Sequence, residues 1–496
     1  MTRTYRIAAP AAWAWPVLAS PQSWPSLGAG ELTVRLLRKQ GRRALYRASG
    51  RGVEVTFLVV AGAESATLHP VPDDADLADP GPPVLTWTVQ ELSADECELR
   101  WTAHDRIPPP LDAFWTDPAC SGVVASWAAD IHHARTQPDP LAAASALAAM
   151  ARADAPHAEA AGTLGMGTVT ALRATGLFRL GLPKALGGAD VEPRTIVSAV
   201  AELSRADAAA GWCASISANQ SAYTAWLDED VARDMADDDG GPVVAGATAI
   251  SGRAEPAGDT VLVTGRWRFN SGCLHADWLV AGVSMPADEG RIPVLAFVRP
   301  EDATILGTWD VVGLAGTGSH DVVLEQTPVP RRRIAPLFTM PARAGGTLHR
   351  LSPYNIQAVF MLGVPLGLAR GALDELTRLV GTPDARAAVE LARLETDLAA
   401  ARALALDTVD GYWCELATAA ALPPASQARL ALVLRHAVDT AKRITATAAR
   451  LAGPDTPAHA TLRRFVRDAF AVGAHLAVSD EIYERNAGRL YAGAAG

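Results

Sequence analysis

The pattern of hydrophobic residues changes character three times along this chain, and the order of these changes constrains the fold more than any other feature. Residues 1–138 contain segments in which apolar and polar residues alternate, as in half-buried β-strands. Alanine and leucine recur at helical spacing over 139–242, valine, threonine and glycine predominate over 243–345, and helical spacing returns over 346–496. This order predicts an α+β domain, a helical domain, a middle β domain and a C-terminal helical bundle.

The first 138 residues are set apart by their tryptophans, since seven of the thirteen lie there. Alternation over 53–60, 85–89 and 98–103 predicts antiparallel strands, and the helical spacing from Cys120 to Ala134 predicts a closing helix. The segment Thr136–Pro140 has the composition of a linker. We therefore expect a separate α+β domain over 1–138.

The start of this region is similar to a known family. The stretches Ala9–Trp15 and Ser23–Pro25 resemble the beginning of the helix-grip, polyketide-cyclase-like (START-like) domains. That resemblance implies a domain that binds a small molecule, which this chain would use to hold or deliver a substrate.

Length and charge narrow the classes of function. A chain of 496 residues is too long for one hydrophobic core, so several domains are expected. The net charge is −10 and the lysines and arginines form no sustained stripe, which argues against nucleic acid as a partner and favours a small-molecule substrate. No stretch of about 18 apolar residues stands out, so we expect no membrane partner.

The cysteines indicate the compartment. There are five, an odd number, and they are far apart without a C-x-x-C pair, so neither a disulfide framework nor a zinc site is indicated. The apolar run Ala8–Ala19 follows two arginines as in a signal peptide, but Pro10 and Pro16 interrupt it. We expect a cytoplasmic protein without a metal site.

Five stretches in a fixed order carry a second resemblance. They are Arg173–Gly188, Gly211–Trp212, Gly265–Gly272, Gly313–Ser319 and Leu462–Asp468. Together they resemble acyl-CoA dehydrogenases and, more closely, the two-component flavin-dependent monooxygenases that share their fold. The resemblance implies a helical N-terminal domain, a β-barrel-like middle domain and a C-terminal four-helix bundle, which in these families usually assembles as a tetramer or a dimer.

The resemblance also implies a set of cofactor contacts. In the family, the strand of the third stretch runs beside the flavin ring and its serine donates toward flavin N5, which here implies Ser271, Gly272, and Trp267 and Asn270 as neighbours. A reduced flavin that reacts with oxygen needs a site without water and a hydrogen bond at N5. The alternative is that Trp267 is a core aromatic and Ser271 an ordinary turn residue.

Two arginines are candidates for the flavin phosphate. Arg463 and Arg464 carry bidentate groups suited to a phosphate, and the alternative is that they pair with carboxylates in the bundle.

His475 is the candidate catalytic residue. It follows Arg467 by eight residues, on a helix that we expect over about Thr461–Glu484 and that the oxygenases use to place a histidine by the flavin. An imidazole could deprotonate a phenol or stabilise its negative charge during oxygen transfer. The alternative is a structural histidine with a satisfied hydrogen bond.

The substrate contacts implied by the resemblance are Asn219, Thr248 and Ser251. They correspond to the helix after Gly211–Trp212 and the first strand of the β domain, which line the substrate pocket in related oxygenases. Asn219 replaces a histidine that some phenol hydroxylases have there, which puts a phenolic substrate in doubt. Each of the three could instead be structural.

One position separates the oxygenases from the dehydrogenases. Many acyl-CoA dehydrogenases have a catalytic glutamate where this chain has Leu476, and Glu484 lies two helical turns too late. The dehydrogenases' signals for the adenine half of FAD are not visible over 378–397, which favours FMN. Because no nicotinamide site is convincing, reduced flavin must come from a partner flavin reductase.

These observations lead to one hypothesis and two alternatives. We expect an oxygenase that takes reduced FMN from a reductase and uses O2 to hydroxylate, or to oxygenate at nitrogen or sulfur, an aromatic or polyketide-like molecule, in secondary metabolism. The first alternative is an FAD-containing desaturase of the acyl-CoA dehydrogenase type. The second is a ligand-binding protein without catalytic activity.

Overall fold

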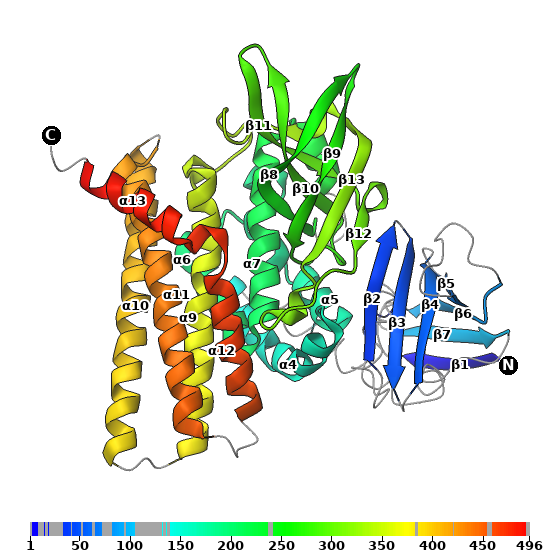
Figure 1. The fold of residues 1–496 in the computed structure, drawn as a ribbon, viewed down its shortest axis with the longest axis horizontal. Coiled ribbons are helices and arrows are strands. Elements are labelled where there is room, and N and C mark those ends of the chain that lie inside the picture. Colours follow the sequence, from blue (N-terminus) through cyan, green and yellow to red (C-terminus); the bar gives the residue numbers. More distant parts are fainter. Residues whose placement is uncertain are drawn as a thin grey trace.

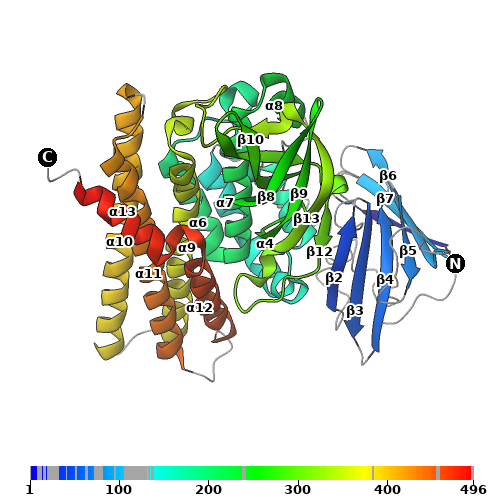
Figure 2. The same cartoon turned by 45° about the horizontal axis from the view of Figure 1, so that its top comes forward.

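The computed structural model describes residues 2–7, 14, 18, 33–40, 42–50, 53–61, 65–71, 82–93, 96–104, 131, 135, 139–236, 242–381, 385–419, 421–453 and 459–492. An N-terminal sheet, a helical region, a second β region and a helical bundle follow one another along the chain, in the order that the sequence predicts (Figure 1). The N-terminal sheet and the bundle lie at opposite ends of the molecule in Figures 1 and 2, with the other two regions between them.

The N-terminal sheet is antiparallel, and its described strands follow the order β1-β7-β6-β5-β4-β3-β2. These strands are β1 (Thr2–Ile7), β2 (Thr33–Gln40), β3 (Arg43–Gly50), β4 (Val53–Ala61), β5 (Ser65–Pro70), β6 (Leu85–Ser93) and β7 (Glu96–Ala103). Alternation buries one face, where Trp87 lies opposite Trp101 in the neighbouring strand. The three strands predicted from alternation are confirmed, and the predicted helix Cys120–Ala134 lies almost wholly outside the described residues.

The helical region surrounds one fully buried helix, α7. Its elements are α4 (Pro140–Ala161), α5 (Met166–Ala174), η2 (Leu177–Arg179), η3 (Lys184–Leu186), α6 (Pro193–Ala206), α7 (Ala208–Ala222), η4 (Tyr223–Trp226) and α8 (Glu229–Ala236). Asp139 begins α4 by accepting a hydrogen bond from the Ala142 N–H, and Asp207 begins α7 in the same way from Ala210. Every residue of α7 is buried, so this helix can position side chains in the interior.

The second β region is a mixed sheet. Its strands are β8 (Val244–Ala257), β9 (Thr260–Asn270), β10 (Trp278–Ala287), β11 (Gly290–Val298), β12 (Thr304–Leu306), β13 (His320–Pro330) and β14 (Ile334–Ala335), joined in part by η5 (Pro300–Asp302), η6 (Ala315–Thr317) and η7 (Arg331–Arg333). The strand order is β12-β13-β9-β8-β10-β11-β14, and β8 and β10 are parallel. β12 also pairs with β2, so the described strands of the two β regions form one sheet of 14 strands.

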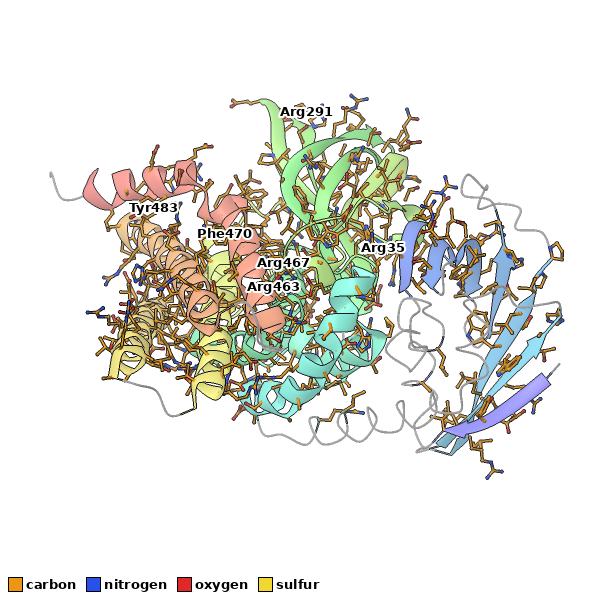
Figure 3. The ribbon with its side chains drawn as sticks, turned by 60° about the horizontal axis from the view of Figure 1, so that its bottom comes forward. Arg35, Arg291, Arg463, Arg467, Phe470 and Tyr483 are labelled. Atoms are coloured by element: carbon orange, nitrogen blue, oxygen red, sulfur yellow. The ribbon has the colours of Figure 1, made fainter. Side chains whose placement is uncertain are left out.

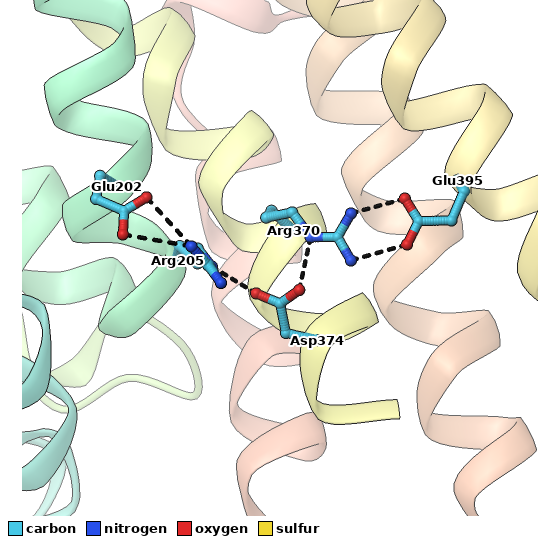
Figure 4. Close-up of polar contacts among 5 residues, drawn as sticks. All are labelled: Glu202, Arg205, Arg370, Asp374 and Glu395. Atoms are coloured by element: carbon cyan, nitrogen blue, oxygen red, sulfur yellow. Dashed lines mark hydrogen bonds and ion pairs between the residues drawn. The ribbon is translucent and has the colours of Figure 1, made fainter. Parts of the chain in front are cut away.

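The bundle contains three long helices and two shorter ones within the described part of the chain. After η8 (Thr347–Arg350) come α9 (Pro353–Val380), α10 (Ala385–Thr418), α11 (Pro424–Ala452), α12 (His459–Gly473), η9 (Leu476–Val478) and α13 (Asp480–Ala492). Leu394 and Leu398 of α10 are buried, as their helical spacing predicts. A chain of ion pairs between Glu202, Arg205, Asp374, Arg370 and Glu395 connects α6, α9 and α10 (Figure 4).

The helix α9 corrects one expectation. By length and composition it could cross a membrane, although we expected no such segment, but 89% of its most apolar window is buried inside the protein. A Cβ added at Gly367 of α9 would lie 2.2 Å from the Ala201 carbonyl oxygen of α6, so glycine permits the close contact between the two helices. α9 is therefore the core helix of the bundle.

Candidate functional site

The site predicted around Ser271 lies where β9 ends and a turn leads toward β10. β9 ends at Asn270, and Gly272 has a φ of +75°, which glycine adopts without the steric cost that other residues meet. The Gly272 N–H donates to the Thr317 carbonyl oxygen over 2.9 Å. This bond attaches the turn to the loop 313–319, so the two glycine-containing stretches of the sequence form one structural unit.

A chain of hydrogen bonds runs through Ser271. Trp212 Nε1 donates to Ser271 Oγ over 2.9 Å, and Ser271 Oγ lies 2.7 Å from Ser319 Oγ. Ser319 Oγ lies 2.7 Å from Thr317 Oγ1, which donates to the Leu314 carbonyl oxygen over 2.8 Å. The three hydroxyl groups are buried, and we call them the hydroxyl relay.

Counting protons gives the direction of the hydroxyl relay. A hydroxyl has one proton and two lone pairs, and a carbonyl oxygen can only accept. With Thr317 Oγ1 donating to the carbonyl oxygen, Ser319 donates to Thr317 and Ser271 donates to Ser319. Ser271 Oγ then accepts from Trp212 and keeps one lone pair. In this arrangement Ser271 Oγ can accept one further hydrogen bond and its proton is directed to Ser319, whereas the sequence predicts a donor toward flavin N5.

His475 contacts the same tryptophan. The rings of His475 and Trp212 meet edge to face with their centroids 5.4 Å apart. His475 Nδ1 accepts a hydrogen bond from the Ala477 N–H over 3.1 Å, so the proton of the neutral ring is on Nε2. Burial lowers the pKa of His475 to about 4, and the ring is neutral at pH 7. The structure thus joins His475 and Ser271, which are distant in the sequence, through Trp212.

The position of His475 differs from the sequence prediction. We expected one helix over Thr461–Glu484, but α12 ends at Gly473 and α13 begins at Asp480. Between them, the His475 side chain begins η9 by accepting the Ala477 N–H. His475 therefore lies at a break between helices, where its ring is held by a backbone hydrogen bond, and not on a continuous helix.

The Arg467–Asp468 pair holds the loop 313–319 against α12. The Leu314 N–H donates to Asp468 Oδ1 over 2.6 Å, and Arg467 Nε donates to the Val312 carbonyl oxygen over 3.0 Å. Arg467 also forms an ion pair with Glu159 of α4. Burial raises the pKa of Asp468 to about 7. These contacts make Asp468 and Arg467 residues that position the hydroxyl relay.

Asn270 and Trp267 support the turn from within the β region. Asn270 Nδ2 donates to the carbonyl oxygens of Trp267 over 2.6 Å and His320 over 3.0 Å, which joins β9 to β13. The Trp267 ring is 1% exposed, and its Nε1 donates to the Gly282 carbonyl oxygen over 2.9 Å. Trp267 is a core aromatic in this structure, in agreement with the structural alternative, and direct contact of its ring with a flavin is not supported.

The two candidate arginines have different surroundings. Arg463 is exposed on α12, where Figure 3 labels it one helical turn from Arg467. Arg464 is buried beside Asp207 and Asp468, and each of these carboxyl groups experiences its positive charge. Arg463 is thus accessible to a phosphate, whereas the surroundings of Arg464 favour the alternative of pairing with carboxylates.

Asn219 belongs to a polar stripe of α7. A helix with 3.6 residues per turn places on one face the residues Trp212, Ser215 and Asn219 of α7 and Tyr223, which directly follows α7. Asn219 is 1% exposed, and within the described residues neither of its amide atoms, nor Ser215 Oγ, has a hydrogen-bond partner of acceptable geometry. Tyr223 lies close enough for its hydroxyl to be influenced by the Asn219 amide. Buried amide groups without partners cost free energy, which makes this stripe a candidate ligand contact.

Thr248 and Ser251, the other two predicted substrate residues, lie on the first strand of the second β region. They lie on β8, in the stretch where its pairing with β10 shifts register; Thr248 is half-buried and Ser251 is exposed. The contacts of α7 with β8 are made by Ser217 and Gln220, which point to other faces of the helix than Asn219. Among the described residues, neither Thr248 nor Ser251 forms a hydrogen bond with Asn219.

Several residues of the site were not chosen from the sequence. Trp212, Thr317 and Ser319 lie inside three of the five stretches named above. The spacing of these residues in the sequence does not show that their side chains contact Ser271 or one another. Phe269 is a fourth: its φ is +64°, unusual for a bulky residue, and its side chain is 57% exposed next to Trp309, two residues before Ser271.

The residues present fit a reduced flavin. The N5 atom of a reduced flavin carries a proton and that of an oxidised flavin does not, and the free lone pair of Ser271 Oγ suits the protonated form. Leu476, which replaces the glutamate of many dehydrogenases, is 64% exposed and cannot remove a proton from a thioester. Glu484 is exposed on α13. The donors and acceptors of the site thus agree better with oxygenation than with desaturation.

Comparisons with known proteins agree with this geometry. Residues 360–480 match the family model "Acyl-CoA dehydrogenase, C-terminal domain". The chain is 29% identical over 348 residues to indole-3-acetate monooxygenase of Pseudomonas putida, an alignment that covers 66% of this chain and 86% of the relative. It is 32% identical over 251 residues to the oxygenase component of the FADH(2)-dependent resorcinol hydroxylase of Rhizobium sp. (strain MTP-10005), covering 48% and 61%. The crystal structure of 3-HSA hydroxylase from Rhodococcus sp. RHA1 superimposes with a TM-score of 0.65 and 26% identity, covering 71% and 95%.

The class of protein follows from the fold and these matches: the chain has an acyl-CoA dehydrogenase-like fold. More particularly, it is an enzyme, a flavin-dependent monooxygenase similar to the oxygenase components of two-component systems. The matches favour this function over the desaturase and the binding protein, and they agree with the predicted dependence on reduced flavin.

Proposed function

We propose that this protein hydroxylates an electron-rich aromatic small molecule, using reduced flavin delivered by a separate flavin reductase. The observation that carries the proposal is the arrangement around Trp212, which donates to Ser271 Oγ in the hydroxyl relay and contacts the ring of a neutral His475. The names of the relatives, which act on indole-3-acetate and resorcinol, support an aromatic substrate.

The residues divide the work as follows. Reduced flavin, when bound, would supply the electrons that activate O2, from which the substrate receives one oxygen atom and the other leaves as water. Ser271 would hold the flavin by accepting the proton on N5, while Trp212 and Ser319 fix the direction of its hydroxyl group. Arg463, the exposed arginine of α12, is the candidate contact for the flavin phosphate.

His475 would act as a hydrogen-bond donor. Its Nδ1 already accepts a backbone N–H, so its neutral ring presents Nε2–H, which can stabilise negative charge on a phenolate or on the oxygen being transferred. A general base needs a free lone pair with a pKa near the working pH, and burial lowers the pKa of this ring to about 4. Of the two catalytic roles expected from the sequence, stabilisation of charge is the one we propose.

Asn219 would bind the polar group of the substrate. Its amide can donate and accept at once, and Tyr223 and Ser215 lie along the same stripe. Hydroxylated or amide-containing aromatic rings offer matching groups. Thr248 and Ser251 are weaker candidates, because Thr248 is only half-buried and Ser251 is exposed, whereas Asn219 is buried.

Four further proposals concern the setting of the enzyme. The antiparallel N-terminal sheet with β1 beside β7 supports a helix-grip domain that binds or delivers substrate. Exposed apolar side chains on and after α12, Phe470, Leu476 and Tyr483, support assembly into dimers or tetramers (Figure 3). Buried free thiols support a cytoplasmic location. A role in secondary metabolism rests on the cyclase-like resemblance alone.

The test of the proposed function is incorporation of oxygen. The full chain is mixed with a flavin reductase, NADH, either FMN or FAD, and a panel of phenols and indoles under 18O2, and the products are analysed by mass spectrometry. We expect one 18O atom in a ring hydroxyl group, with faster turnover on FMN than on FAD. Asn219→Leu should raise KM for the accepted substrate. Desaturated products without 18O, or no flavin binding by the purified protein, would overturn the proposal.

A further inference from the structure

The N-terminal domain is joined to the flavin-binding region by main-chain hydrogen bonds. β2 pairs with β12 in antiparallel register, with Gln40 opposite Thr304 and Lys39 opposite Ile305. The Gly307 N–H donates to the Leu37 carbonyl oxygen over 2.6 Å.

One side chain crosses this joint toward the flavin site. Lys39 Nζ donates to the Leu274 carbonyl oxygen over 3.2 Å. Burial lowers the pKa of Lys39, and the nearby carboxylates of Asp277 and Glu301 act in the opposite direction. Leu274 lies in the turn that begins at Ser271, so the contact reaches the backbone that carries the proposed flavin contact.

The turn is tied at its other points by the flavin module itself. Gly272 is bonded to Thr317, the Cys273 N–H donates to Asn270, and the His275 N–H donates to Gly272 over 3.0 Å. The His275 ring lies 2.8 Å from the Thr163 hydroxyl group. Within the described residues, Lys39 is the side chain of the N-terminal domain that donates a hydrogen bond to this turn.

We propose that Lys39 is a positioning residue for the flavin site, through which docking of the N-terminal domain sets the conformation of the turn Ser271–His275. The ammonium fixes the Leu274 carbonyl group, and the hydrogen bonds of the turn then fix Ser271. The N-terminal domain is thus a structural part of the oxygenase site in addition to any role in binding substrate. This inference rests on the proposed flavin site for its functional consequence.

The test uses full-length Lys39→Met and Lys39→Arg, with Gln40→Met as the matched control, because Gln40 is the exposed neighbour on the same strand. Hydrogen exchange at the Cys273 and His275 amides is measured without flavin, and the Kd for reduced flavin is measured anaerobically by fluorescence. We expect faster exchange in the turn and a Kd about tenfold weaker for Lys39→Met, as for the loss of one charged hydrogen bond. Lys39→Arg should restore both within about twofold.

Two results would overturn the proposal: wild-type exchange and Kd in Lys39→Met, or equal changes in Gln40→Met. Failure of the wild-type protein to bind any flavin would refute the proposed function. In that case hydrogen exchange in the turn, which is measured without flavin, would still show whether Lys39 fixes its conformation. If Lys39→Met does not fold, Gly307→Ala provides a second variant, since a Cβ there would lie 2.3 Å from the Leu37 carbonyl oxygen and push β2 from β12. It should also loosen the turn, and unchanged exchange there would count against the proposal.

Discussion

Replacing Ser319 by alanine should change which redox state of the flavin this protein prefers. Ser319 receives the proton of Ser271 and donates its own to Thr317, so its removal frees the Ser271 proton. Ser271 could then donate to the unprotonated N5 of oxidised flavin as well as accept the N5–H of reduced flavin. Its hydroxyl group would no longer distinguish between the two redox states. The wild-type relay favours reduced flavin, and the variant should lose that selectivity.

The magnitude follows from one hydrogen bond. A net contribution of about 0.5–1.5 kcal/mol corresponds to a change of about 2- to 12-fold in the ratio of the Kd for oxidised flavin to that for reduced flavin. For a two-electron couple, tenfold is about 30 mV, so the midpoint potential of the bound flavin should fall by roughly 10–30 mV. Anaerobic titration of both redox forms and spectroelectrochemistry measure the two quantities independently.

The control is Ser221→Ala, which removes a buried hydroxyl group of α7 that bonds to the Ala218 carbonyl oxygen outside the hydroxyl relay. Both variants should lose some thermal stability, but only Ser319→Ala should change the ratio. An unchanged ratio in Ser319→Ala, or the same change in Ser221→Ala, would show that the direction of the relay does not determine redox selectivity.

Three further predictions concern single side chains. His475→Ala should lower the rate of hydroxylation about 100-fold and release more hydrogen peroxide per NADH consumed. The pH-rate profile of the wild type should show no ionisation near 6.5, because burial lowers the pKa of His475 to about 4. A clear titration near 6.5 that disappears in the variant would refute this. Asn219→Leu should leave the melting temperature unchanged or raised, since it removes a buried amide without partners, and a loss above about 2 kcal/mol would show that the amide is structural. Burial raises the pKa of Asp468 in the folded state to about 7 from 3.8, so the contribution of this group to stability falls as the pH rises from about 4 to 7. The free energy of unfolding of Asp468→Asn, measured in urea, should therefore gain about 1–4 kcal/mol relative to that of the wild type over this range. A difference that stays constant with pH would contradict this prediction.

The order of the domains could be predicted from the sequence because hydrophobic periodicity reflects burial directly. Alternation at 53–60 and the helical spacing of Leu394 and Leu398 correspond to strands and a buried helical face in the structure. The break at His475 could not be predicted in this way, because it depends on a side chain that accepts a backbone N–H two residues ahead. Helical spacing continues through that segment, so periodicity alone indicates one helix.

The site was predictable in position but not in its contacts. Ser271 was identified by the stretch in which it lies and His475 by its distance from Arg467. Their connection through Trp212, however, depends on packing between α7, the turn after β9 and the end of α12. The burial of Trp267 could not be predicted, because an aromatic residue on this strand can point into the sheet interior as well as toward a cofactor. Lys39 was missed because the joint between β2 and β12 leaves no signal in local sequence.

The most direct test of the account is the affinity of the wild-type protein for the two redox states of flavin, measured anaerobically on one preparation. The account predicts that reduced flavin binds more tightly than oxidised flavin, because Ser271 Oγ can accept the N5 proton and has none to donate. Equal affinity, or tighter binding of oxidised flavin, would contradict the direction of the hydroxyl relay and with it the proposed basis of flavin selectivity in this oxygenase.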